Sequence, residues 1–182
     1  MSWSFRSKFR SIEIVNGPSL WPSVGWVVLA LYAQTVFAPL VTLRHAVPSL
    51  TTIAIVLYAL RVGGRRGAAL GIVAGVLTDA VAGTAGGWTI ADTVVGLGAG
   101  AVARGFFADG ILPPSFLVAA AVFVRDGVFW IVMVMEGYPR GFGTTHLHES
   151  LWQAALTGAT ALAYLYVRMR FFDDSTRIER YG

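Results

Sequence analysis

Residues 112–135 of this chain read LPPSFLVAAAVFVRDGVFWIVMVM, an apolar run that opens with two prolines and carries Arg125 and Asp126 near its middle. A helix needs about 17 to 25 apolar residues to cross a lipid bilayer, and this run meets that requirement. Proline is tolerated in the first turn of a helix, so Pro113 and Pro114 mark a helix start. The run therefore predicts a transmembrane helix with two charges inside it.

The composition of the whole chain agrees with a membrane environment. Of its 182 residues, 55% are hydrophobic and only 13% are charged, and the mean hydropathy is +0.64. A water-soluble domain of this length needs a larger charged shell. The pI of about 9.9 comes almost entirely from dispersed arginines, which fits a membrane surface better than nucleic acid. We expect an all-α polytopic membrane protein with no nucleic-acid partner.

Five further apolar runs complete a predicted six-helix transmembrane bundle. The predicted helices cover residues 24–43, 49–60, 67–82, 88–103, 112–135 and 147–167. The second to fourth are shorter than a usual span, so their ends are the least certain. The chain then divides into an N-terminal tail (1–23), a transmembrane domain (24–167) and a C-terminal tail (168–182). The N-terminal tail could lie on the membrane surface, although a disordered tail is the interpretation we favour.

The positions of the basic residues predict the orientation, because basic residues in short loops stay on the cytoplasmic side. With the N-terminus inside, only Arg44 and Arg140 fall in outer loops, so both termini are predicted to be cytoplasmic. Aromatic residues near the predicted helix ends indicate interfacial anchors. The inner basic loop contains Arg61, Arg65 and Arg66, and the anchors are Trp21, Trp26, Trp88, Tyr138 and Trp152.

Glycines recur at every fourth position in two predicted helices. Gly67, Gly71 and Gly75 lie in the third, and Gly96 and Gly100 lie in the fourth. This spacing gives a smooth face on which helix backbones approach closely. The face could meet a partner subunit or another helix of the same chain. We favour packing within the chain, since every small multi-span protein needs such faces.

The charges inside the predicted spans need partners, because each costs ~2.5–3.5 kcal/mol at the centre of a membrane helix. Asp79 and Asp92 are the predicted partners of Arg125, and with Asp126 they form an intramembrane polar cluster. Arg125 and Asp126 point about 100° apart on a helix, so one neighbour cannot satisfy both. The cluster could be a proton relay or a ligand site. We favour a structural ion pair, because a transport path usually has more polar side chains.

The sequence shows no catalytic motif, cofactor site or metal site. The absence of cysteine excludes thiolate catalysis and cysteine metal ligands. Gly96, Gly98 and Gly100 are not followed by the Gly-Lys pair of a phosphate-binding loop. His146, His148 and Glu149 are predicted to lie in a solvated outer loop, where adjacent ligands make only a weak metal motif. We therefore expect a protein that is not an enzyme.

The order of features in residues 48–106 resembles the MreD family of rod shape-determining proteins. A basic inner loop, a glycine-spaced helix, a late aspartate and a glycine-rich outer turn follow one another as in that family. Ser49 stands where the family often has an acidic or amide residue. The residues that carry the resemblance are Leu57-Tyr58-Ala59-Leu60-Arg61, Arg65-Arg66-Gly67, Gly71, Gly75, Leu77, Asp79, Gly83 and Gly86-Gly87.

The resemblance implies a multi-pass scaffold of the bacterial cell-elongation complex in the inner membrane. Its implied partner is MreC, with MreB, RodA and a class B penicillin-binding protein as further candidates, together with membrane lipid and a second copy of the chain. The family's fold is similar to that of the substrate-binding subunits of energy-coupling-factor vitamin transporters, which supplies an alternative function. The first predicted helix lacks the paired alanines with which those subunits dock, so we favour the scaffold.

Overall fold

The computed structural model describes residues 19–37, 42, 46–103, 111–139, 141 and 143–172. Within these ranges the chain forms six α-helices and no β-strand, which confirms the expected all-α class and the number of helices. The helices are α1 (Leu20–Phe37), α2 (Leu50–Val62), α3 (Gly64–Ala82), α4 (Gly87–Val102), α5 (Leu112–Met135) and α6 (Gly143–Phe172).

The observed helix bounds differ from the predicted ones mainly in α1 and α6. Helix α1 begins at Leu20, before the predicted residue 24, because Pro22 fits within the first turn of a helix. Helix α6 begins at Gly143 and ends at Phe172, so it extends the predicted 147–167 at both ends. The first residues of the predicted C-terminal tail are therefore helical. Residues 1–18 and 173–182 of the two predicted tails lie outside the described residues.

Local signals in the sequence explain where α2 and α3 begin and end. Ser49 is the N-cap of α2, and its side chain accepts a hydrogen bond from the Thr52 backbone N–H. Gly63 has φ of +88°, a conformation that favours glycine, and it separates α2 from α3. Gly83 has φ of +71° and ends α3. These two glycines set the directions in which α3 leaves α2 and the chain turns toward α4.

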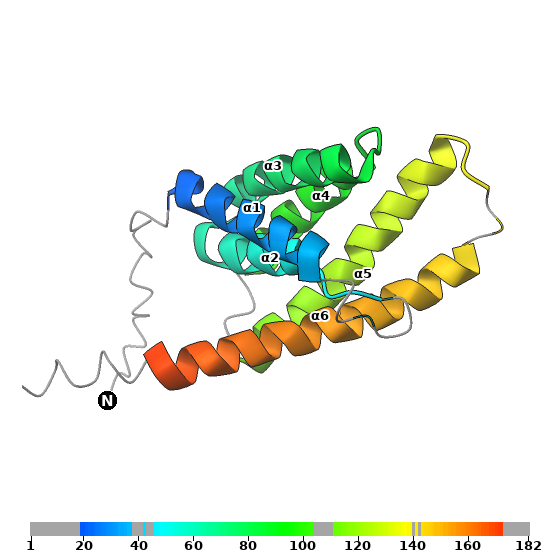
Figure 1. Cartoon of the computed structure of the whole chain (residues 1–182). Coiled ribbons are helices and arrows are strands. Elements are labelled where there is room, and N and C mark those ends of the chain that lie inside the picture. The colour runs from blue at the N-terminus through cyan, green and yellow to red at the C-terminus, as the bar shows by residue number, and fades with distance from the viewer. Residues whose placement is uncertain are drawn as a thin grey trace, which may run out of the picture.

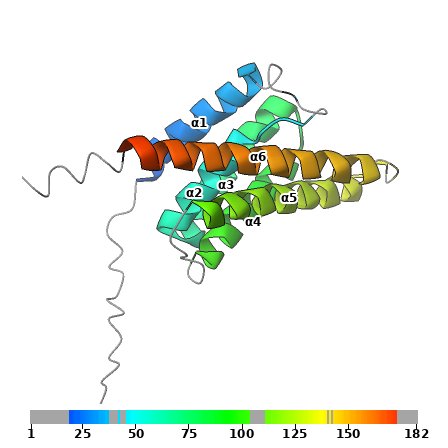
Figure 2. The same cartoon turned by 90° about the horizontal axis from the view of Figure 1, so that it is seen from below.

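Figure 1 shows α1 to α4 grouped together, with α5 and α6 lying across this group. Viewed from below in Figure 2, α5 and α6 run side by side as an antiparallel pair. Helix α5 packs on α4 and α2, whereas α6 packs mainly on α5. All six helices contribute to the apolar core, α6 through Ala161, and its other fully buried side chains include Val27, Ile55, Val56, Leu70 and Val118.

The predicted glycine face of α3 packs against α4 of the same chain. A Cβ added at Gly71 would lie 2.7 Å from the carbonyl carbon of Asp92, and one at Gly75 would lie 2.7 Å from the backbone N of Thr89. Gly67 and Gly96 lie opposite each other, and Gly100 lies against Gly64. Backbone meets backbone along this contact, so only hydrogen fits at these positions. The glycine face is therefore filled within the chain.

Apolar side chains cover much of the outside of the described bundle. Trp21 is 80% exposed, Phe116 72% and Met135 82%. By contrast, charged and hydroxyl side chains lie inside, including Asp92 at 0% and Arg125 at 2%. By length and composition, α5 is the one helix of the described chain that could cross a membrane by itself. Leu20–Val36 and Leu50–Val62 are shorter apolar helices.

The close approach of α3 and α4 predicts that Gly71→Ala lowers the stability of the protein. The new methyl group would meet backbone atoms of α4, which cannot move aside as a side chain can, and overpacking of this kind costs ~1–3 kcal/mol. Gly98→Ala is the matched control, because a Cβ at Gly98 meets nothing within 4 Å. The unfolding temperatures of the purified variants measure the difference. Equal unfolding temperatures for Gly71→Ala and Gly98→Ala would contradict the observed contact.

Candidate functional site

Arg125 lies at the centre of the described bundle and pairs with Asp92. Its Nε lies 2.6 Å from Oδ1 of Asp92, so the ion pair joins α5 to α4. The two side chains are 2% and 0% exposed, respectively. The glycine contact between α3 and α4 runs past the Asp92 backbone at Gly71. The close contact between α3 and α4 therefore also fixes the position of Asp92 along the bundle, and with it the place where Asp92 meets Arg125.

The indole ring of Trp88 covers one face of the Arg125 guanidinium, and Phe129 stacks on that ring. The guanidinium carbon lies 4.1 Å from the ring centroid of Trp88, and Trp88 stacks on Phe129 with ring centroids 3.8 Å apart. Phe129 follows Arg125 by four residues, which places both on the same face of α5. A guanidinium over an indole gains a cation–π attraction of about 2 kcal/mol when it is desolvated. The interfacial anchoring predicted for Trp88 stays a prediction, and these ring contacts add to it a role beside Arg125.

The buried start of α2 is the second polar neighbour of Arg125. Nη1 of Arg125 lies 3.5 Å from Oγ of Ser49. The backbone N–H of Ser49 in turn donates a hydrogen bond to Oγ1 of Thr157 on α6 at 2.9 Å. The next N–H, at Leu50, donates to Oε1 of Gln34 on α1 at 3.1 Å. The first N–H groups of a helix have no partner within it. Side chains from α1 and α6 supply partners for the N–H groups of Leu50 and Ser49 here, so the buried beginning of α2 is tied to both helices.

Asp126 points away from Asp92, as the angle between adjacent helical residues requires. Its Oδ1 lies 3.9 Å from Nη1 of Arg125, and Ser150 of α6 is a further polar neighbour of the carboxylate. The Asp126 backbone carbonyl lies 3.1 Å from Nε2 of His146, whose ring stacks on Trp130. Asp126 therefore belongs to the contact between α5 and α6, whereas Arg125 belongs to the contact between α5 and α4.

We define the central polar cluster as Arg125, Asp92, Asp126 and Ser49. Among the described residues, Oδ2 of Asp92 and both carboxylate oxygens of Asp126 have no hydrogen-bond donor. Two carboxyl groups thus share one guanidinium. An unpaired buried carboxylate is costly, so the cluster as described has the capacity to accept one proton or a small cation.

Asp79 does not reach Arg125 in the way the sequence suggested, and this is a correction to the predicted cluster. Its Oδ1 accepts hydrogen bonds from the backbone N of Trp88 and from Oγ1 of Thr84. Its Oδ2 accepts from the backbone N and Oγ1 of Thr89 at 2.9 and 2.6 Å. Gly86, the N-cap of α4, has no capping side chain. Asp79 of α3 caps α4 instead, and a carboxylate is favourable at a helix N-terminus.

Among the remaining predicted residues, His146 contacts the central polar cluster through the backbone carbonyl of Asp126. Arg61, Arg65 and Arg66 are exposed on both sides of the junction between α2 and α3. His146, His148 and Glu149 were expected in a loop, and the structure places them in the first turns of α6. His148 contacts Trp152, whose Nε1 lies 3.4 Å from its Nε2. The described residues contain no group of three or more histidine, cysteine or acidic side chains that could hold a metal ion.

Sequence reasoning missed Ser49, Trp88 and Thr157 as neighbours of the buried charges. For Ser49 a signal exists, because a serine directly before an apolar run with threonine three positions later is a typical helix start. Trp88 and Thr157 carry no such signal, because their roles depend on how α4 and α6 pack against α5.

Comparison of the chain with protein-family models, with curated proteins and with solved structures finds no match.

The ion pair predicts that Arg125→Gln destabilises the protein by about 3–5 kcal/mol, because it leaves the buried Asp92 carboxylate without its partner. Adding Asp92→Asn to this variant should cost much less than it does in the parent, since the two side chains are coupled. Arg66→Gln removes an exposed arginine and is the control, with an expected effect within about 0.5 kcal/mol. Denaturant unfolding of the purified proteins measures the two single buried variants, the double variant and the Arg66→Gln control. Strictly additive effects of the two buried substitutions would refute the coupling.

Proposed function

We propose that this chain is an integral membrane protein whose six helices form one transmembrane bundle. The observation that carries the proposal is the distribution of polar and apolar side chains in the bundle. Apolar side chains are exposed on the outside, whereas the charged side chains of Asp92, Arg125 and Asp126 are buried inside. In water such an arrangement exposes large apolar patches, which soluble monomers avoid. In a membrane, ionisable side chains face the bundle interior and pair with one another. The short helices α2 and α4 are supported on their sides by longer neighbours.

The basic residues give this bundle an orientation. Arg61 at the end of α2 and Arg65 and Arg66 at the start of α3 lie at one end, and Figure 1 places the C-terminal end of α6, with Arg168 and Arg170, on the same side. Basic residues near the ends of membrane helices are retained in the cytoplasm. We assign this end, which we call the basic end, to the cytoplasmic face. The turn between α3 and α4 then faces outward.

Labelling of single cysteines would test this orientation, and the chain is suited to it because it contains no native cysteine. Ala85→Cys lies in the exposed turn between α3 and α4, and Arg66→Cys lies at the basic end. A membrane-impermeant maleimide should label Ala85→Cys in intact cells and Arg66→Cys only after the membrane is opened. The reverse pattern would invert the proposed topology, and labelling of both in intact cells would contradict a membrane-spanning bundle.

Within this membrane location we propose a scaffolding function rather than catalysis or transport. The central polar cluster is enclosed, and its charges are used to join α4, α5 and the start of α2. The glycine face is filled within the chain. Partner proteins therefore have the outer faces of the helices and the basic end to bind. The resemblance to the MreD family supports a role in the cell-elongation complex beside MreC, in the bacterial inner membrane.

A second candidate function is supported by the unpartnered carboxylate oxygens of Asp92 and Asp126. They could hold a small polar ligand, as the alternative of a substrate-binding subunit of an energy-coupling-factor vitamin transporter requires. Two neighbours argue against this, because the guanidinium of Arg125 already lies against Asp92, and the Trp88 and Phe129 rings are stacked on each other.

Affinity purification of the tagged protein in mild detergent distinguishes the two functions. We expect MreC and cell-wall synthases to remain bound to the scaffold. Gly98→Ala, where an added Cβ meets nothing within 4 Å, serves as a folded control and should recover the same partners. Recovery of an energising ATPase module or a bound vitamin would overturn the scaffold proposal in favour of the transporter subunit.

A further inference from the structure

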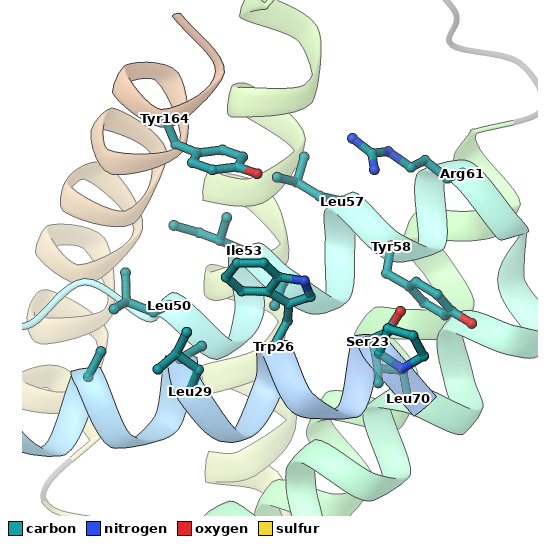
Figure 3. Close-up of a pocket in the computed structure, with 14 residues that line it drawn as sticks. Ser23, Trp26, Leu29, Leu50, Ile53, Leu57, Tyr58, Arg61, Leu70 and Tyr164 are labelled. Carbon is teal, nitrogen blue, oxygen red and sulfur yellow. The ribbon is translucent and has the colours of Figure 1, made fainter. Parts of the chain in front are cut away.

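A groove on the outside of the bundle lies between α1, α2 and α6. It encloses about 450 Å³, a size typical of sites for small ligands, which are ~300–1,000 Å³. Figure 3 shows α2 as its floor, with Trp26 and Leu29 of α1 on one side and Tyr164 of α6 on the other. Most of its lining is apolar, and Trp26 and Tyr164 are 67% and 51% exposed.

The groove is apolar along its length and charged at one end. Leu50 and Ile53 lie toward one end of α2, and Arg61 lies at the other. In Figure 3 the Arg61 guanidinium and the Tyr164 hydroxyl both extend toward Leu57. The ion pairs of the described chain include no carboxylate partner for Arg61. The charged end of the groove coincides with the basic end of the bundle, where Arg65 and Arg66 follow.

The length of the groove suits a hydrocarbon chain. From Leu50 to Arg61 the axis of α2 rises roughly 16 Å at 1.5 Å per residue, about half of the ~30 Å hydrocarbon core of a bilayer. The groove thus has the length of one extended acyl chain within one leaflet.

We propose that this groove is a binding site for an anionic glycerophospholipid of the cytoplasmic leaflet. One acyl chain lies along Leu57, Ile53 and Leu50, beneath Trp26, and the phosphate group lies against Arg61. The Tyr164 hydroxyl is a second polar group at the level of the headgroup. Charge complementarity carries the choice of lipid, because an arginine near the membrane surface attracts anionic lipid, whereas a zwitterionic headgroup gains little from it. This inference rests on the proposed membrane location.

Native mass spectrometry of the full-length protein in detergent would test the site, with phosphatidylglycerol and phosphatidylcholine of identical acyl chains as the probes. The parent protein should retain phosphatidylglycerol preferentially, and Arg61→Gln should reduce this preference about fivefold. Arg66→Gln is the matched control, because it removes the same charge from the same end outside the groove. Equal loss of preference in both variants would show diffuse attraction to the basic end and overturn the site.

Two further measurements distinguish a lipid in the groove from a lipid bound elsewhere on the bundle and from a partner helix. Ala33→Phe places a ring in the groove and should reduce retention of both lipids, whereas Ala101→Phe on the exposed side of α4 should not. A photoreactive residue at position 29 should crosslink to lipid in cells, and a crosslink to protein would show that a partner helix covers the groove. Recovery of the protein in the soluble fraction without detergent would refute the membrane location itself. A membrane-bound protein without lipid preference would refute the lipid site alone.

Discussion

Arg125 is the point at which the two parts of the bundle are joined. It reaches Asp92 on α4 through Nε and Ser49 at the start of α2 through Nη1, and its flat face lies over Trp88. Two helices that are separate in the sequence, α2 and α4, therefore depend on one side chain of α5. Since a guanidinium presents its donors in a fixed fork, a flexible ammonium cannot reproduce all of these contacts. The positions of α2 and α4 relative to α5 follow from this geometry.

The glycine contact between α3 and α4 makes that geometry available. If α4 stood at the usual distance of 8–10 Å from its neighbour, Asp92 would be displaced relative to Arg125. The hydrogen at Gly71 allows α3 to press directly on the backbone that carries Asp92. Asp79 then holds the first N–H groups of α4 and fixes its direction. Small residues and buried charges, which the sequence presents as separate features, act on the same helix.

The sequence predicts α5 and the pairing of Arg125 with Asp92 because both follow from local rules. A long apolar run with prolines at its start has one interpretation, and a buried arginine needs a carboxylate. The same reasoning gave the wrong partner for Asp79, because an acidic residue before a helix can either cap that helix or pair with a basic residue far away in the sequence. The geometry of the turn between α3 and α4 decides between these two roles. The start of α6 was missed because residues 143–146 read Gly-Thr-Thr-His and contain no large apolar side chain. His146 is held on α5 by the Asp126 carbonyl and the Trp130 ring, which no sequence spacing reveals.

Asp92 and Arg125 are separated by 33 positions in the chain, and this separation has a consequence for biosynthesis. In the membrane bundle proposed above, if the helices enter the bilayer in order, α3 and α4 can pair as soon as both are made, because they share an extensive contact with each other. Asp92 then remains an uncompensated charge in lipid until α5 delivers Arg125. The hairpin of α3 and α4 is thus provisional, and a nascent chain that stalls before α5 presents a carboxylate to membrane quality control. The ion pair that stabilises the finished bundle would also mark it as complete.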